Sequence, residues 1–300
     1  MESQDKIKML LERIDHQLMF NQGKNIFHNS GTNALSFISE TKQSAYVLSE
    51  LDTETKSLLV DYITDKVIEE FCRINQYYSF DQQSKQELRH LYTELMSAME
   101  KMELPLKTIS ENHFGKIISW LQKHNAFAEQ IYSTKTDNIE PVTCAEYSAE
   151  LQLKILHINP NEINTPVLDI GCGKLGNMVR YLRNNGLETF GFDRFATEGP
   201  FIDKHDWLEY SYGDAKWGTI ISNLGFTNHF YHHHLRDDGR FIEYAKKYIE
   251  ILTALKPGGQ FFYAPGLDFI EQYLDKKRFS VTPNPIESTG IKSVTIKKLA

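Results

Sequence analysis

The stretch Val167-Leu-Asp-Ile-Gly-Cys-Gly-Lys-Leu-Gly-Asn177 decides the fold of this 300-residue chain. A short, mostly apolar run leads directly into a G-x-G-x-x-G turn formed by Gly171, Gly173 and Gly176. Glycines let the backbone turn sharply and approach a ligand closely, and the N-terminus of the following helix attracts an anionic group. The pattern predicts a strand, a ligand-binding turn and a helix, and the simpler alternative is a tight turn that holds no ligand.

The same alternation continues outward from this turn to the end of the chain. Short β-branched and aromatic runs predict strands at 167–170, 189–192, 218–222, 260–263, 278–283 and 292–298. Helical spacing of apolar residues predicts helices at 143–157, 175–185, 239–255 and 268–274. Strands that alternate with helices form parallel sheets with right-handed crossovers, so we expect an α/β domain over residues 141–300.

Three features beside the turn narrow the class of ligand. Asp169 stands two residues before the first glycine, where an acid would repel a pyrophosphate but attract an amino group. Asp193 ends the second predicted strand, where one carboxylate can accept hydrogen bonds from two ribose hydroxyls. The segment Leu255-Lys-Pro-Gly-Gly-Gln-Phe-Phe-Tyr263 is expected to end a helix, turn and enter a buried strand. The first and third features weigh against an NAD-dependent dehydrogenase, which is the less favoured alternative.

Together and in this order, these motifs resemble the class I S-adenosylmethionine-dependent methyltransferases, over residues of about 143–300. The resemblance implies a Rossmann-like domain with a seven-stranded, mostly parallel sheet whose last strand is antiparallel. It implies S-adenosylmethionine as the cofactor, with Gly171, Gly173 and Gly176 forming the turn that presents backbone to its methionine part. Asp169 would lie near the ammonium group and Asp193 would hold the ribose hydroxyls.

The family also places an acid after the third strand, where it recognises the adenine amino group. Asp206 and Asp214 both stand before the strand expected near Trp217. Asp214 would leave a connecting loop shorter than the family uses, so we predict Asp206, with Trp207 beside it as an adenine-packing or backbone contact.

The methyl acceptor is expected beside Ser222-Asn-Leu-Gly-Phe-Thr-Asn-His-Phe-Tyr-His-His-His-Leu235, which follows the fourth strand. Asn223 stands where amine-directed methyltransferases carry N-P-P-Y, but both prolines are absent. We predict Asn223 as a further cofactor-binding residue. We predict His229 as a catalytic or acceptor-contacting residue, because the ordinary pKa of histidine suits general-base work. If the segment is helical, His229 and His233 share one face at a spacing that suits a metal, but we predict no metal site.

The resemblance does not extend to residues 1–140, which have few glycines and helical spacing of apolar residues. This segment is expected to form an all-α domain of about five helices, with Asp81 and the pair Ser110 and Glu111 as helix caps. We predict that it caps the acceptor site. The apolar wall of that site would include Tyr147 from the second domain, which we predict with His229 as a catalytic residue.

The amino-acid composition limits the class of protein, its partners and its location in the cell. The hydrophobic fraction of 41% and charged fraction of 24% are typical of globular chains, and the net charge of −7 disfavours nucleic acids and anionic membranes. The three scattered cysteines and the lack of a signal peptide or a membrane-spanning run of about 20 apolar residues predict a cytoplasmic protein.

We therefore expect an enzyme that transfers a methyl group to an oxygen or nitrogen of a small molecule. The alternative is a protein or RNA methyltransferase that uses the helical domain for docking. The oligomeric state is left open.

Overall fold

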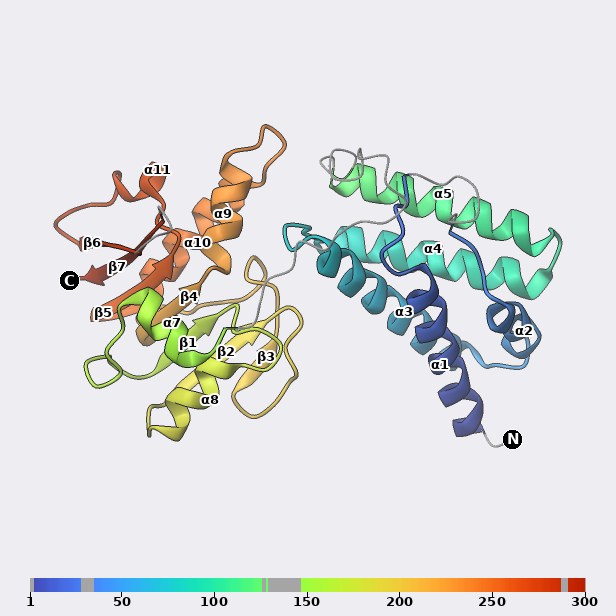
Figure 1. Ribbon diagram of the computed structural model, residues 1–300, viewed down its shortest axis with the longest axis horizontal. Coiled ribbons are helices and arrows are strands. Elements are labelled where there is room, and N and C mark those ends of the chain that lie inside the picture. The colour runs from blue at the N-terminus through green and yellow to red at the C-terminus, as the bar shows by residue number, and fades with distance from the viewer. Residues whose placement is uncertain (1–2, 28–34, 126–127, 129–146, 287–290, 300) are drawn as a thin grey trace. The chain divides into compact units, whose positions relative to one another are not determined.

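A computed structural model describes residues 3–27, 35–125, 128, 147–286 and 291–299 (Figure 1). The chain divides into two compact units, Met1–Cys144 and Ala145–Ala300. No helix in the described ranges is long and apolar enough to cross a membrane. The cytoplasmic location and the roles assigned to the two segments stay predictions.

The first unit is helical, as the spacing of its apolar residues predicts. Its described helices are α1 (Ser3–Asn21), α2 (Ser39–Leu48), α3 (Thr53–Ile74), α4 (Gln82–Lys101) and α5 (Leu106–His124). Their apolar faces meet in a core that includes Leu10, Leu48, Leu59, Met99 and Ile109.

One of the two predicted helix caps is confirmed and the other is wrong. The Asp81 side chain accepts a hydrogen bond of 2.8 Å from the backbone N–H of Ser84 and so caps α4. The helix expected to begin at Ser110 is α5, which begins at Leu106 with Pro105 at the N-cap position. The missing N–H of proline costs no hydrogen bond there, because the first N–H groups of a helix have no acceptor within it, and Ser110 is instead buried inside the helix.

The second unit alternates strands and helices along the chain. Its elements are α7 (Ala149–Leu156), β1 (Val167–Ile170), α8 (Asn177–Asn184), β2 (Thr189–Asp193), β3 (Ile202–Lys204), β4 (Trp217–Asn223), α9 (Phe226–His234), α10 (Phe241–Ala254), β5 (Leu255–Ala264), α11 (Asp268–Glu271), β6 (Phe279–Pro285) and β7 (Lys292–Lys298). The bounds of β1 and β7 are those predicted. The Pro-Gly-Gly turn is part of β5, and the start of the helix predicted at 143–157 lies outside the described residues.

The seven strands form one sheet in the order β3-β2-β1-β4-β5-β7-β6. Neighbouring strands from β3 to β5 are parallel, while β7 is antiparallel to both β5 and β6. The predicted α/β class and the antiparallel last strand are therefore confirmed. The carboxyl ends of β1, β2, β3 and β4 lie along one edge of the sheet, where ligands bind in open α/β folds.

Helices cover both faces of the sheet. One core joins α9 and α10 to inward-facing residues such as Ile170, Phe192 and Phe261. A second core joins α7 and α8 to Val167, Ile221 and other residues. Because side chains alternate along a strand, Asp169 shares the second face with Val167, at the carboxyl end of β1.

Candidate active site

Three acids stand at the carboxyl ends of three neighbouring strands. Asp169 lies in β1, Asp193 is the last residue of β2, and Asp206 follows β3 by two residues. Burial raises the pKa of both Asp169 and Asp193; the charge of Asp193 adds to the rise at Asp169, and the charge of Asp206 adds to the rise at Asp193. The structure thus brings the three predicted acids close enough to repel one another, which favours a ligand that carries positive charge or hydrogen-bond donors.

The glycine turn has the backbone geometry that its sequence predicts. Gly171, Gly173 and Gly176 have φ values of +75°, +76° and +61°, in the left-handed region that side chains disfavour. A Cβ atom on Gly171 would lie 3.3 Å from the Trp207 ring and 3.6 Å from the Cα of Gly225. The turn after β1 therefore packs directly against the loop after β4.

Asp193 holds this turn in place. Its carboxylate accepts hydrogen bonds from the backbone N–H of Gly173 at 3.3 Å and of Phe195 at 2.8 Å. Burial raises the pKa of this half-buried carboxyl, and the two hydrogen bonds oppose the rise. Each carboxylate oxygen has a second lone pair, so the group retains capacity for two further donors such as ribose hydroxyls.

Asp169 is the most unusual group at the site. It is 1% exposed, and its Oδ2 atom accepts no hydrogen bond from the residues that the structure describes. Burial, with a smaller contribution from Asp193, raises the pKa of Asp169 to about 7. Leaving a buried carboxylate oxygen without a partner is unfavourable, so the site favours a cationic or donating group that the described residues do not supply.

Trp207 and Asp206 lie together after β3. The Trp207 ring is buried against Gly171, and its Nε1–H donates a hydrogen bond of 3.2 Å to the hydroxyl of Tyr244. The Asp206 carboxylate accepts one hydrogen bond, 2.9 Å long, from the backbone N–H of Leu208. Trp207 thus supports the back of the glycine turn, and the adenine contacts of both residues stay predictions.

Asn223 ends β4 beside the same turn. It is 9% exposed, and neither polar atom of its amide has a hydrogen-bond partner among the described residues. Leu224 follows with φ of +54°, a strained value for a side chain of this size, and Gly225 then meets Gly171. The sequence indicated Asn223 but gave no reason to select Gly225, whose role depends on a contact with a turn far away in the chain.

The histidine-rich segment forms α9, so His229 and His233 do share one helical face. They are 2% and 3% exposed. His229 packs edge-on against Trp207, with ring centroids 4.6 Å apart, and His233 stacks on Tyr244. Burial, together with the charge of Arg194, lowers the pKa of His229 well below its ordinary value. An imidazole whose pKa is lowered is a weaker base, and the general-base role of His229 stays a prediction.

The metal alternative also finds no support in this segment. Within the described part of the chain, no group of three or more histidine, cysteine, aspartate or glutamate side chains is arranged to hold a metal ion.

Tyr147 lies close to the start of α8 and is half-buried. Its backbone carbonyl accepts hydrogen bonds from the Asn177 side chain at 3.3 Å and from the Gln152 side chain at 3.1 Å. Because Asn177 directly follows Gly176, these bonds tie the segment before α7 to the glycine turn. Asn177 ends the glycine-rich stretch 167–177, but the sequence predicted no role for the Asn177 side chain.

The seven-stranded, mostly parallel sheet and its antiparallel last strand agree with what the sequence resemblance implies. The second unit has the fold of the class I S-adenosylmethionine-dependent methyltransferases. It is a Rossmann-like methyltransferase fold, and the site just described occupies the carboxyl edge of its sheet.

No family model matches this sequence, and no curated protein matches it. Among solved structures, it is similar to the N-methyltransferase NodS from Bradyrhizobium japonicum, at 13% identity over 50% of this chain and 96% of that one, with a TM-score of 0.36. It is similar to the glycopeptide N-methyltransferase MtfA complexed with S-adenosylmethionine, at 14% identity over 53% and 98% of the two chains, with a TM-score of 0.35.

A further similar structure is the [4+2]-cyclase SpnF, at 13% identity over 53% of this chain and 85% of that one, with a TM-score of 0.38. A fold by itself does not determine a function, so the function has to be argued from the site.

Proposed function

We propose that this protein binds S-adenosylmethionine and transfers its methyl group to an oxygen or nitrogen of a small-molecule acceptor. The observation that carries the proposal is the buried Asp169 carboxylate at the glycine turn, with one oxygen that has no partner among the described residues. The ammonium of a methionine group would supply both the positive charge and the donors that this oxygen lacks. A dinucleotide would instead bring a pyrophosphate toward an acid.

The residues around Asp169 fit the remaining parts of this cofactor. The backbone of Gly171 and Gly173 would face the methionine part, and Asp193 would accept hydrogen bonds from the ribose hydroxyls. The Asp206 carboxylate would accept a hydrogen bond from the adenine amino group, and Trp207 would pack against the adenine. When bound, S-adenosylmethionine supplies a methyl group on a sulfonium, which is a good leaving group.

The protein's own contribution would then be to orient the acceptor in line with the methyl group and to exclude water. Asn223, whose amide donor and acceptor have no partners among the described residues, is suited to hold a polar group of the acceptor. We also propose that Tyr147 lines the acceptor pocket and that the helical unit covers it. A general base is needed only where the acceptor arrives protonated, and His229 would serve mainly by packing against Trp207.

Calorimetry on the full chain tests the cofactor. We expect saturable binding of S-adenosylmethionine and of S-adenosylhomocysteine, and no binding of NAD at the same concentrations, because Asp169 disfavours the pyrophosphate. Binding of NAD without binding of S-adenosylmethionine would overturn the proposed function in favour of a dehydrogenase.

We expect the Asp193→Ala variant to bind S-adenosylmethionine about tenfold more weakly or worse, because the ribose hydroxyls lose a charged acceptor. The matched control is Asp203→Ala, which removes an exposed acid from the neighbouring strand β3. Circular dichroism checks that both variants keep the fold, and calorimetry gives the affinities. Equal affinities for Asp193→Ala and Asp203→Ala would remove Asp193 from the binding site.

A further inference from the structure

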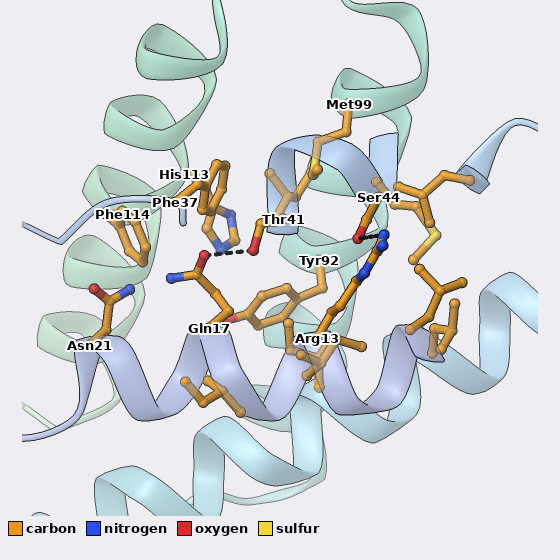
Figure 2. Close-up of a pocket in the computed structure, with 18 residues that line it drawn as sticks. Arg13, Gln17, Asn21, Phe37, Thr41, Ser44, Tyr92, Met99, His113 and Phe114 are labelled. Atoms are coloured by element: carbon orange, nitrogen blue, oxygen red, sulfur yellow. Dashed lines mark hydrogen bonds between the residues drawn. The ribbon is translucent and has the colours of Figure 1, made fainter. Parts of the chain in front are cut away.

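The helical unit contains a cavity of its own. The cavity has a volume of about 120 Å³ and lies among α1, α2, α3, α4 and α5 (Figure 2). Most of its wall is apolar and includes Leu10, Leu59, Leu95, Met96, Met99 and Phe114. A dry, apolar cavity of about 150 Å³ binds benzene, and the volume of this cavity, about 120 Å³, is close to that.

One polar side chain in the wall already forms three hydrogen bonds within the protein. Gln17 donates a hydrogen bond of 2.8 Å to the carbonyl of Ser36 and accepts hydrogen bonds from the Ile38 N–H at 2.9 Å and the Thr41 hydroxyl at 2.7 Å. These bonds fasten α1 to the segment that leads into α2. Gln17 therefore shapes the cavity but has little capacity left for a ligand.

Arg13 is different, because most of its donors are uncommitted. Its guanidinium donates one hydrogen bond of 3.1 Å, to the Ser44 hydroxyl, as Figure 2 shows. Arg13 contributes to lowering the pKa of exposed Glu40, but its guanidinium forms no ion pair with a carboxylate in the described part of the chain. A guanidinium has five N–H donors in a planar fork that matches a carboxylate, so Arg13 can receive one.

His113 is another polar side chain in the cavity wall. It is 5% exposed, and its ring forms no hydrogen bond with a residue that the structure describes. In Figure 2 the ring is turned toward Gln17 and Thr41, and it packs edge-on against Tyr92, with ring centroids 4.8 Å apart. Burial lowers the pKa of His113 to about 3, so its ring is neutral at physiological pH and offers one donor and one acceptor.

We propose that this cavity binds a small carboxylic acid whose apolar body is about the size of a benzene ring. The apolar wall would bury the body, while Arg13 would receive the carboxylate and His113 could donate a further hydrogen bond. The contacts that carry this inference lie entirely within the helical unit. The inference therefore does not rest on the proposed methyl transfer.

Calorimetry on the full chain with benzoate and benzamide tests the preference for a negative charge. The two probes have the same ring and nearly the same size, but only benzoate carries a charge. We expect saturable binding of benzoate about tenfold tighter than that of benzamide, because hydrogen bonds to charged groups are stronger than those to neutral ones. Equal affinities, or no binding of benzoate, would overturn the proposal.

Two arginine variants locate the site. Arg13→Gln should reduce the affinity for benzoate about tenfold and leave that for benzamide nearly unchanged. Arg89→Gln makes the same change on α4, at a side chain that pairs with Asp61 and does not line the cavity, and it should preserve the preference for benzoate. A preference that survives Arg13→Gln would place the carboxylate elsewhere and refute the site.

Arg13→Gln and Arg89→Gln should both bind S-adenosylmethionine as tightly as the unchanged protein does. Failure of the cavity proposal and failure of the proposed function are therefore separate results. The comparison of the two probes requires no variant. It therefore remains decisive even where Arg13→Gln disturbs the helical fold.

Discussion

Replacing Gly173 by valine is expected to weaken binding of S-adenosylmethionine about a hundredfold or more. The backbone φ of +76° at this position disfavours every side chain, and a β-branched one most of all. The new side chain would also occupy space where the backbone has to approach the ligand, and it would disturb the hydrogen bond from the Gly173 N–H to Asp193. A hundredfold loss corresponds to about 2.7 kcal/mol, which is within reach of strain and lost contacts acting together.

The control for this variant is Gly186→Val. Gly186 has φ of +81°, so valine is strained there too, but a Cβ atom at Gly186 meets nothing within 4 Å. It lies after α8, away from the glycine turn. Both variants should lose stability by similar amounts in thermal unfolding, while calorimetry should find the loss of affinity in Gly173→Val alone. If Gly173→Val binds as tightly as Gly186→Val, the turn does not contact the cofactor.

The Asp169→Asn variant should bind S-adenosylmethionine more weakly by about tenfold to a hundredfold, because the ammonium loses its charged partner. The ligand-free protein should nevertheless become more stable above neutral pH. The asparagine side chain has nearly the same shape and carries no charge, so it removes the cost of a buried carboxylate that has one oxygen without a partner. Affinity and stability thus change in opposite directions, which a general loss of structure would not produce.

The direction of the pH dependence follows from the raised pKa of Asp169. The pKa is about 7 in the folded chain and about 3.9 in an unfolded one. The folded state holds the Asp169 proton more tightly than the unfolded state, so protonation of Asp169 stabilises the fold. This stabilisation is fully present below about pH 4 and is lost as the pH rises to about 7. The difference in unfolding free energy between Asp169→Asn and the unchanged protein should therefore grow between pH 5 and pH 8.

Urea unfolding of both proteins at the two pH values measures this difference. Parallel changes in the two proteins would show that Asp169 ionises normally in the folded state. Calorimetry provides a second readout, because an ammonium that pairs with Asp169 would lower its pKa. Binding of S-adenosylmethionine near pH 6 should then release a proton, detected as a binding enthalpy that varies with the ionisation enthalpy of the buffer. A binding enthalpy that does not depend on the buffer would contradict the pairing.

The sequence by itself determined most of the strands and helices of the second unit and the strand ends at which acidic residues stand. Val167–Ile170 is a strand as predicted, because a short run of mostly apolar residues followed by glycines has few other structures available. The same local signals placed Asp169 and Asp193 at strand ends. Parallel strands that alternate with helices must bring such ends to one edge, so the location of the candidate site was also predictable.

Only the tertiary structure decided what surrounds each of these residues. Burial and partners depend on segments far apart in the chain, as where Gly225 lies against Gly171. The sequence left open whether His229 lies on a helix, and the lowered pKa of His229 comes from burial against Trp207 and from the charge of Arg194. The unpartnered oxygen of Asp169 and the cavity beside Arg13 likewise arise from packing between elements, which residue types and their spacing do not specify.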